Sequence, residues 1–173
     1  MAEHIAELAT EIEHGSLRSI TGDFYEVDPG GPFDVVAYFD GFGLGSNEDQ
    51  RRLLRRVIAW LTSEGCALID VLTPWFLSKT SGDEEEFPEG SGIRYREGFD
   101  ADGNSMTEQM WRAGHEADVV TQSLRCYSPA DLRLSLEGTD LALAEVEPYS
   151  DQWHGEPCAL EAAMVYLAKL VPG

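Results

Sequence analysis

The chain has 173 residues, of which 43% are apolar and 25% charged, the composition of an ordinary globular domain, so wholesale disorder is excluded. Twelve basic residues against 32 acidic ones give a formal net charge of −20, which disfavours nucleic acid and anionic membranes as partners. There is no apolar run long enough for a membrane span, no signal-peptide pattern and no CxxC pair among the three cysteines. We therefore expect a cytoplasmic protein with no metal site and no disulfide framework.

The first half of the chain predicts alternating helices and strands. Apolar residues in the first 14 positions share one helical face, and a short extended stretch follows at Leu17–Ile20. Residues 28–32 (DPGGP) predict a turn. The segment Phe33–Phe39 is apolar on both faces, as is typical of a strand inside a parallel sheet. A helix capped by Ser46 and continuing to Leu61 comes next, and Cys66–Leu72 predicts a second strand of the same buried type.

Residues 75–118 break this alternation, because they combine an acidic run with many glycines and scattered aromatic residues. We expect an inserted lid there. A strand is predicted at Val119–Cys126, followed by a helix that Ser128 caps and Gly138 ends. A last strand, Leu141–Val146, is predicted to end at Pro148, and a helix is predicted over Ala159–Leu170. These elements indicate an α/β domain.

Two carboxylates follow predicted strands. Asp23, with Phe24 beside it, could bind and stack on an amino-purine, although a turn aspartate and a core phenylalanine are the commoner explanation of such a pattern. Asp40 follows the strand Phe33–Phe39, at the edge where open α/β sheets bind ligands, and it begins a glycine-rich loop that would let a ligand approach the backbone. A purely structural role in the turn is the alternative for Asp40.

The remaining candidates lie around the predicted lid. His115 could act as a general base, or it could be a solvated loop histidine. No pair of histidines has the spacing of metal ligands. The aromatic residues of the lid could line an apolar pocket or could fix the lid to the core. The aromatic residues that we assign to substrate binding are Trp75, Phe76, Tyr95, Trp111 and Tyr127.

Taken in order, several segments resemble the class I S-adenosylmethionine-dependent methyltransferases: Gly22-Asp23-Phe24, Phe33–Val36, Asp40–Gly43, Leu53–Val57, Trp60–Val71 and Arg125–Pro148. The resemblance implies a Rossmann-like fold with a mostly parallel sheet, an antiparallel C-terminal hairpin and helices on both faces. It also implies methyl transfer from S-adenosylmethionine to a small-molecule acceptor. In that case Asp23 and Phe24 would hold the adenine, Tyr38, Phe39 and Asp40 would line the transfer site, and Asp40 or His115 would be the base.

The chain lacks the family's opening part, which carries the glycine-rich cofactor motif Asp/Glu-x-Gly-x-Gly-x-Gly. We therefore expect a single truncated domain over residues 1–173, with 75–118 as the lid, that needs the missing half from a partner or a longer chain. The strand Phe33–Phe39 would then be an edge. We expect a second chain, a copy of this chain or the segment Leu17–Thr21 to cover it. The alternatives are cofactor-independent acid/base chemistry, such as cyclisation, and a non-catalytic partner subunit.

Overall fold

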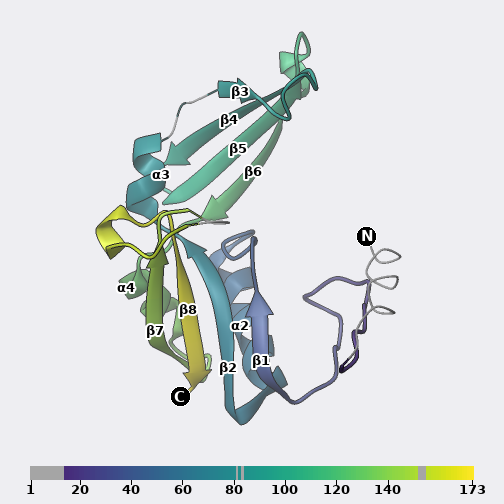
Figure 1. The fold of residues 1–173 in the computed structure, drawn as a ribbon, viewed down its shortest axis with the longest axis vertical. Coiled ribbons are helices and arrows are strands. Elements are labelled where there is room, and N and C mark those ends of the chain that lie inside the picture. The colour runs from purple at the N-terminus through teal and green to yellow at the C-terminus, as the bar shows by residue number, and fades with distance from the viewer. Residues whose placement is uncertain (1–13, 81, 83, 152–154) are drawn as a thin grey trace. The chain divides into compact units, whose positions relative to one another are not determined.

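The structure is a computed structural model that describes residues 14–80, 82, 84–151 and 155–173 (Figure 1). The chain divides into two units, residues 1–31 and residues 32–173, which are described separately. In the first unit, residues 14–31 contain turns but no helix or strand. The segment Leu17–Thr21 is therefore not the strand that was expected to pair with Phe33–Phe39. The helix predicted over residues 1–14 falls almost wholly outside the described residues.

The first sheet of residues 32–173 has the strand order β1-β2-β8-β7 (Figure 1). Strand β1 (Phe33–Tyr38) runs parallel to β2 (Leu61–Leu72), whereas β8 (Val165–Pro172) is antiparallel to both β2 and β7 (Leu141–Tyr149). The predicted α/β class is confirmed. The sheet is mixed, however, and not mostly parallel, because β8 enters between β2 and β7 in the opposite direction.

Two helices, α2 (Asn47–Trp60) and α4 (Pro129–Leu136), contact each other and cover one face of this sheet (Figure 1). Both begin where the sequence predicts. Ser46 and Ser128 cap them, and each serine forms a reciprocal capping box with the aspartate three residues later. Alternate residues of the two central strands are buried beneath the helices, namely Ala67, Ile69, Val71, Tyr166, Ala168 and Leu170. None of the described helices is long and apolar enough to cross a membrane.

The opposite face of the first sheet is only partly covered. Val35 of β1 is 53% exposed, and its register partner Cys66 and the neighbouring Leu68 on β2 are half-buried. Among the strands of the described residues β1 pairs with β2 alone, so it is also an edge strand. The edge position predicted for this strand is confirmed, whereas its burial on both faces is not. Helices on both faces of the sheet are likewise not found among the described residues.

The segment predicted as a lid forms most of a second sheet. Helix α3 (Pro74–Thr80) leads into β3 (Glu84–Glu86), β4 (Ile93–Asp100) and β5 (Ser105–Arg112). These strands pair antiparallel with one another in that order, and β6 (Val120–Arg125) completes the sheet after the short 3-10 helix η2 (Glu116–Asp118). The strand predicted at Val119–Cys126 is therefore present, but it belongs to this second sheet. A buried cluster connects the insertion to the core: Leu72, Leu77, Met106, Leu124 and Cys126.

The helix predicted over Ala159–Leu170 is wrong. A 3-10 turn, η3 (Leu160–Ala162), is followed by strand β8. The apolar residues of this segment fit a helical face, but Tyr166, Ala168 and Leu170 also alternate, and β8 pairs with strands on both sides. These two backbone ladders outweigh the local periodicity. Pro148 also does not end its strand, because β7 is an edge strand, where proline is tolerated.

Candidate functional site

The loop after β1 is fixed by contacts within the chain. The backbone of Asp40 is left-handed (φ +59°), and its amide donates to Oδ1 of Asp70 on β2 at 2.9 Å. Gly43 also has a positive φ of +108°, and a Cβ atom there would collide with the carbonyl oxygen of Arg125. The amide of Gly43 donates to the side chain of the buried Gln50 at 3.1 Å. The glycine-rich loop therefore accommodates the protein's own groups at Gly43, where a ligand had been expected.

A cavity of about 460 Å³ lies beside Asp40, between this loop and the second sheet. One group of its lining residues is apolar and another carries carboxylates, and none of the described residues that line it is a lysine or an arginine. The lining residues are Leu72, Phe87, Met106, Met110 and Met164, with Tyr95, Asp40, Glu85, Glu97, Glu108 and Asp151. Asp40 and Glu108 also line a smaller adjoining cavity of about 50 Å³. We refer to the larger space as the acidic cavity.

The strand period of two explains which residues of the second sheet reach the acidic cavity. On β4, Tyr95 and Glu97 share a face, and their register partners on β5 are Met110 and Glu108. Successive side chains of a strand point to opposite faces. Trp111, the residue after Met110, therefore lies on the other face, where the guanidinium of Arg96 is 5.1 Å from its ring centroid.

Tyr95 connects the two glutamates of this face. Its hydroxyl oxygen lies 2.8 Å from an oxygen of Glu108 and 3.1 Å from an oxygen of Glu97. Burial and the hydrogen bond to Glu108 raise the pKa of Tyr95 well above its ordinary value, so the phenol stays protonated at neutral pH. A phenol has a single proton and can donate it to only one carboxylate at a time. The shared tyrosine therefore leaves acceptor capacity on the glutamate pair.

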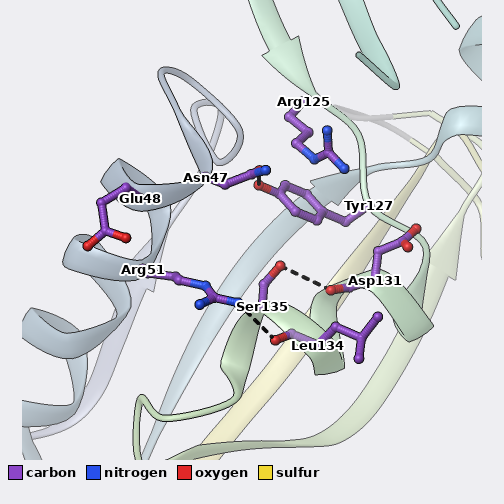
Figure 2. A pocket seen from close by; sticks show the side chains of 8 residues that line it. All are labelled: Asn47, Glu48, Arg51, Arg125, Tyr127, Asp131, Leu134 and Ser135. Carbon is purple, nitrogen blue, oxygen red and sulfur yellow. Dashed lines mark hydrogen bonds between the residues drawn. The ribbon is translucent and has the colours of Figure 1, made fainter. Parts of the chain in front are cut away.

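A second pocket, of about 380 Å³, lies between α2 and α4 (Figure 2). Tyr127 is almost fully buried there, with its hydroxyl 3.2 Å from Oδ1 of Asn47 and its ring packed against Phe42. Burial raises the pKa of Tyr127 to about 12. The guanidiniums of Arg51 and Arg125 donate to backbone carbonyls. The side chains that line this pocket are thus bonded to other parts of the chain, which indicates a mainly structural role for them.

The structure brings only some of the predicted site residues together. Asp40 and Tyr95 line the same cavity. Trp111 is on the opposite face of the second sheet, and Tyr127 lines the pocket in Figure 2, so neither lies at the acidic cavity. His115 is exposed and precedes η2 without a side-chain capping hydrogen bond, with Nδ1 3.7 Å from Oδ2 of Asp118.

The other predicted residues have local roles. Phe76, on α3, packs against the cluster that joins the sheets. Trp75 belongs to the same helix. Tyr38 ends β1, with its hydroxyl over Gly41, and Phe39 is 55% exposed.

Asp23 and Phe24 belong to the first unit and form a local turn. A carboxylate oxygen of Asp23 accepts from the amide of Tyr25 at 2.8 Å, and the ring of Phe24 lies 4.3 Å from that of Tyr25, measured between centroids. This arrangement agrees with the structural alternative for Asp23. It does not test the proposed contact of Asp23 with adenine.

Sequence reasoning missed Glu97 and Glu108, because residues 93–112 were assigned to a lid without regular structure. The signal was present as two alternating segments, Tyr95-x-Glu97 and Met106-x-Glu108-x-Met110. Placing both segments on paired strands would have aligned the two glutamates.

Comparison with known proteins identifies the fold of this chain. No protein-family model matches the chain, and no curated protein matches it. Solved structures do match: the CcbJ methyltransferase of Streptomyces caelestis (TM-score 0.71, 16% identity), an S-adenosylmethionine-dependent methyltransferase of Clostridium acetobutylicum (0.66, 12%) and the glycopeptide N-methyltransferase MtfA bound to S-adenosylhomocysteine (0.56, 16%). The matches cover 100%, 89% and 89% of this chain but 75%, 64% and 60% of those proteins. The chain therefore has the α/β fold of S-adenosylmethionine-dependent methyltransferases and spans about two thirds of their length.

The glycine-rich loop after β1 does not provide a binding site for S-adenosylmethionine. A ligand bound against the loop backbone would need open space beside Gly41, Gly43 and Gly45. Atoms of Tyr38, Arg125 and Asp49 occupy that space. The cavity between Asp40 and Asp70 holds only about 50 Å³. The sequence contains no Asp/Glu-x-Gly-x-Gly-x-Gly motif.

Proposed function

We propose that this chain is the acceptor-binding part of an S-adenosylmethionine-dependent methyltransferase that acts on a small molecule. The position of the acidic cavity carries the proposal. It lies at Asp40, just beyond the carboxyl end of β1, which is the edge where open α/β sheets bind ligands, and the chain has a methyltransferase fold. The second sheet would close over the acceptor as the lid. The neighbour MtfA is an N-methyltransferase of a glycopeptide, which supports a small-molecule acceptor here.

In this proposal the chain's own residues hold and orient the acceptor. Asp40 is the candidate base, because it lines the acidic cavity, which His115 does not. Tyr38 and Phe39 precede Asp40 and would border the transfer site. Asp23 and Phe24, in the first unit, would contribute to adenine binding. The rest of the cofactor site would come from another polypeptide or from a longer form of this chain.

The exposed edge of the first sheet is where such a second polypeptide would bind. Phe33 and Val35 are 36% and 53% exposed on β1, a strand with one partner. An unpaired apolar edge readily accepts another strand. A strand from a second copy of this chain, in a homo-oligomer, or from a different chain would therefore pair with β1 and extend the sheet.

A second candidate function is cofactor-independent acid/base chemistry in the acidic cavity. The contacts of Tyr95 with Glu97 and Glu108 favour it, because they provide a proton donor beside carboxylate acceptors. A reaction of this kind would proceed without S-adenosylmethionine.

The test is methyl transfer by the native assembly, purified through a tag on this chain and supplied with radiolabelled S-adenosylmethionine and a pool of small amines and alcohols. We expect transfer that falls by about 100-fold in Asp40→Asn, the loss typical of a general base. The matched control is Asp118→Asn, on an exposed side chain of η2, which should leave transfer unchanged. An assembly that neither binds S-adenosylmethionine calorimetrically nor transfers methyl groups would contradict the proposal. Turnover without the cofactor would favour the second candidate.

A further inference from the structure

The acidic cavity has the chemistry of a binding site for an organic cation. Of the described residues that line it, five carry carboxylates, none is a lysine or an arginine, and the rest are apolar or aromatic. A site built only for a neutral sugar or alcohol would not need this charge. In a cavity that partly excludes water, a bound cation offsets the cost of holding several carboxylates close together.

The pair formed by Glu97 and Glu108 concentrates that charge. The two residues are register partners on neighbouring strands and face the same cavity. Neither forms an ion pair with a basic side chain of the described residues. On the other face, Glu84 is bound by Arg94 at 2.8 Å and by Arg96 at 2.9 Å. The same sheet thus neutralises one face and leaves the cavity face negative.

The hydrogen bonds of the pair leave room for one more donor. Tyr95 can satisfy only one of the two carboxylates at a time, and the shorter distance is to Glu108. An ammonium group has three donors and would complete the acceptors of Glu97. Among the described residues, no group of carboxylates, histidines or cysteines is placed to hold a metal ion. An organic cation therefore fits the site better than a metal.

The apolar wall of the cavity limits the kind of organic group to which the cation is attached. Met106, Met110, Met164, Leu72 and Phe87 line the cavity together with the carboxylates. Flexible methionines adapt to a ring or short chain. A volume of about 460 Å³ is within the usual range of small-molecule sites.

We infer that the acidic cavity binds a small amine, with the ammonium between Glu97 and Glu108 and its hydrocarbon part against the methionines. The inference builds on the proposed function by naming the class of acceptor, an amino compound. The binding step can nevertheless be measured without cofactor or methyl transfer.

The chain provides its own reporters for the test. It contains four methionines, and three of them, Met106, Met110 and Met164, line the cavity. The protein, labelled with ¹³C at the methionine methyl groups, is titrated with cyclohexylamine and with its neutral counterpart cyclohexanol. We expect saturable shifts of the three cavity signals. Cyclohexylamine should bind at least about tenfold more tightly than cyclohexanol, the ratio that one charge-assisted hydrogen bond provides.

Glu97→Gln and Glu108→Gln should each weaken cyclohexylamine binding by about tenfold while leaving cyclohexanol unchanged. The control is Glu64→Gln, which removes the same charge from an exposed position near the other end of β2. The methyl spectra also report whether each variant is folded. Equal affinity for amine and alcohol overturns the inference, as does the absence of cavity shifts in the wild-type protein.

A third titration, with S-adenosylmethionine, separates the acceptor from the cofactor, because the cofactor is also a cation. Shifts of the cavity signals with S-adenosylmethionine and none with cyclohexylamine would overturn the inference. If amine binding is found but the native assembly transfers no methyl group, the proposed function fails while the amine site stands.

Discussion

Glu97 on β4 and Glu108 on β5 are register partners, and both line the same cavity. Like charges placed directly opposite each other on neighbouring strands destabilise a sheet. The chain could have relieved this repulsion with a nearby arginine, as it does for Glu84 on the other face. It instead shares one tyrosine hydroxyl between the two carboxylates. We interpret this repulsion as lowering the stability of the free protein while favouring the binding of a cation.

Glu97→Gln should therefore stabilise the free protein. Replacing one carboxylate with an amide removes the repulsion with Glu108 and supplies a donor to it, so the free energy of unfolding should rise by about 0.2–1 kcal/mol. Urea denaturation measures the change. The contrasting variant is Glu84→Gln, which loses its two arginine partners and should lower the free energy of unfolding. If both variants destabilise the protein alike, the glutamate pair is not under strain.

Gly43→Ala should destabilise the protein more than Gly114→Ala, although both glycines have a positive φ. Gly43 and Gly114 both have positive φ, but a Cβ at Gly43 would collide with the carbonyl of Arg125, whereas nothing lies within 4 Å of one at Gly114. We expect Gly114→Ala to cost about 1 kcal/mol and Gly43→Ala about 1–3 kcal/mol more. Thermal unfolding of the two variants gives the comparison. Equal losses would mean that the loop moves away from β6 at little cost.

Thiol labelling should distinguish the three cysteines. Cys126 is fully buried, and burial raises the pKa of its thiol to about 11, whereas Cys66 and Cys158 are half-buried. Iodoacetamide reacts with thiolates, so at pH 8 it should modify Cys66 and Cys158 well before Cys126. Mass spectrometry of timed samples measures each rate. Rapid modification of Cys126 would show that the junction of the two sheets opens readily.

The stability of the protein should fall at alkaline pH. The pKa values of Cys126 and Tyr127 are raised to about 11 and about 12 in the folded chain, above ordinary values of about 8.5 and 10. The folded state therefore holds these protons more tightly than the unfolded state does. The free energy of unfolding should be maintained up to about pH 8.5 and then fall as the pH rises toward 11–12. Cys126→Ala should flatten the first part of this decline in urea titrations, and Cys158→Ala should not.

The exposed edge should control association. Val35 is 53% exposed on β1, so Val35→Lys places a charge where a partner strand would pair and should shift an assembly toward the single chain. Light scattering measures the mass. Ala144→Lys, on the exposed part of β7 at the other edge of the sheet, is the control and should leave the mass unchanged. A wild-type chain that is monodisperse as a monomer at all concentrations would rule out self-pairing through β1.

The local signals in the sequence were enough to place several elements. Helices α2 and α4 begin at Ser46 and Ser128 because a serine cap with an aspartate three residues later satisfies backbone groups without help from distant residues. Strand β2 was visible from the apolar run Cys66–Leu72, of which Ala67, Ile69 and Val71 are buried in the core. The carboxyl-edge position of Asp40 followed from the strand before it.

Contacts between distant segments decided the rest. Residues 165–172 fit a helical stripe as well as a strand, and only pairing with both β2 and β7 selects the strand. The cavity depended on the register of β4 and β5, because a shift of one residue would turn Tyr95, Glu97 and Glu108 to the opposite face. The sequence alone thus determined the elements that are stabilised by hydrogen bonds and burial within a few residues of each other. The tertiary structure determined which face each strand presents and, with it, which side chains meet in the acidic cavity.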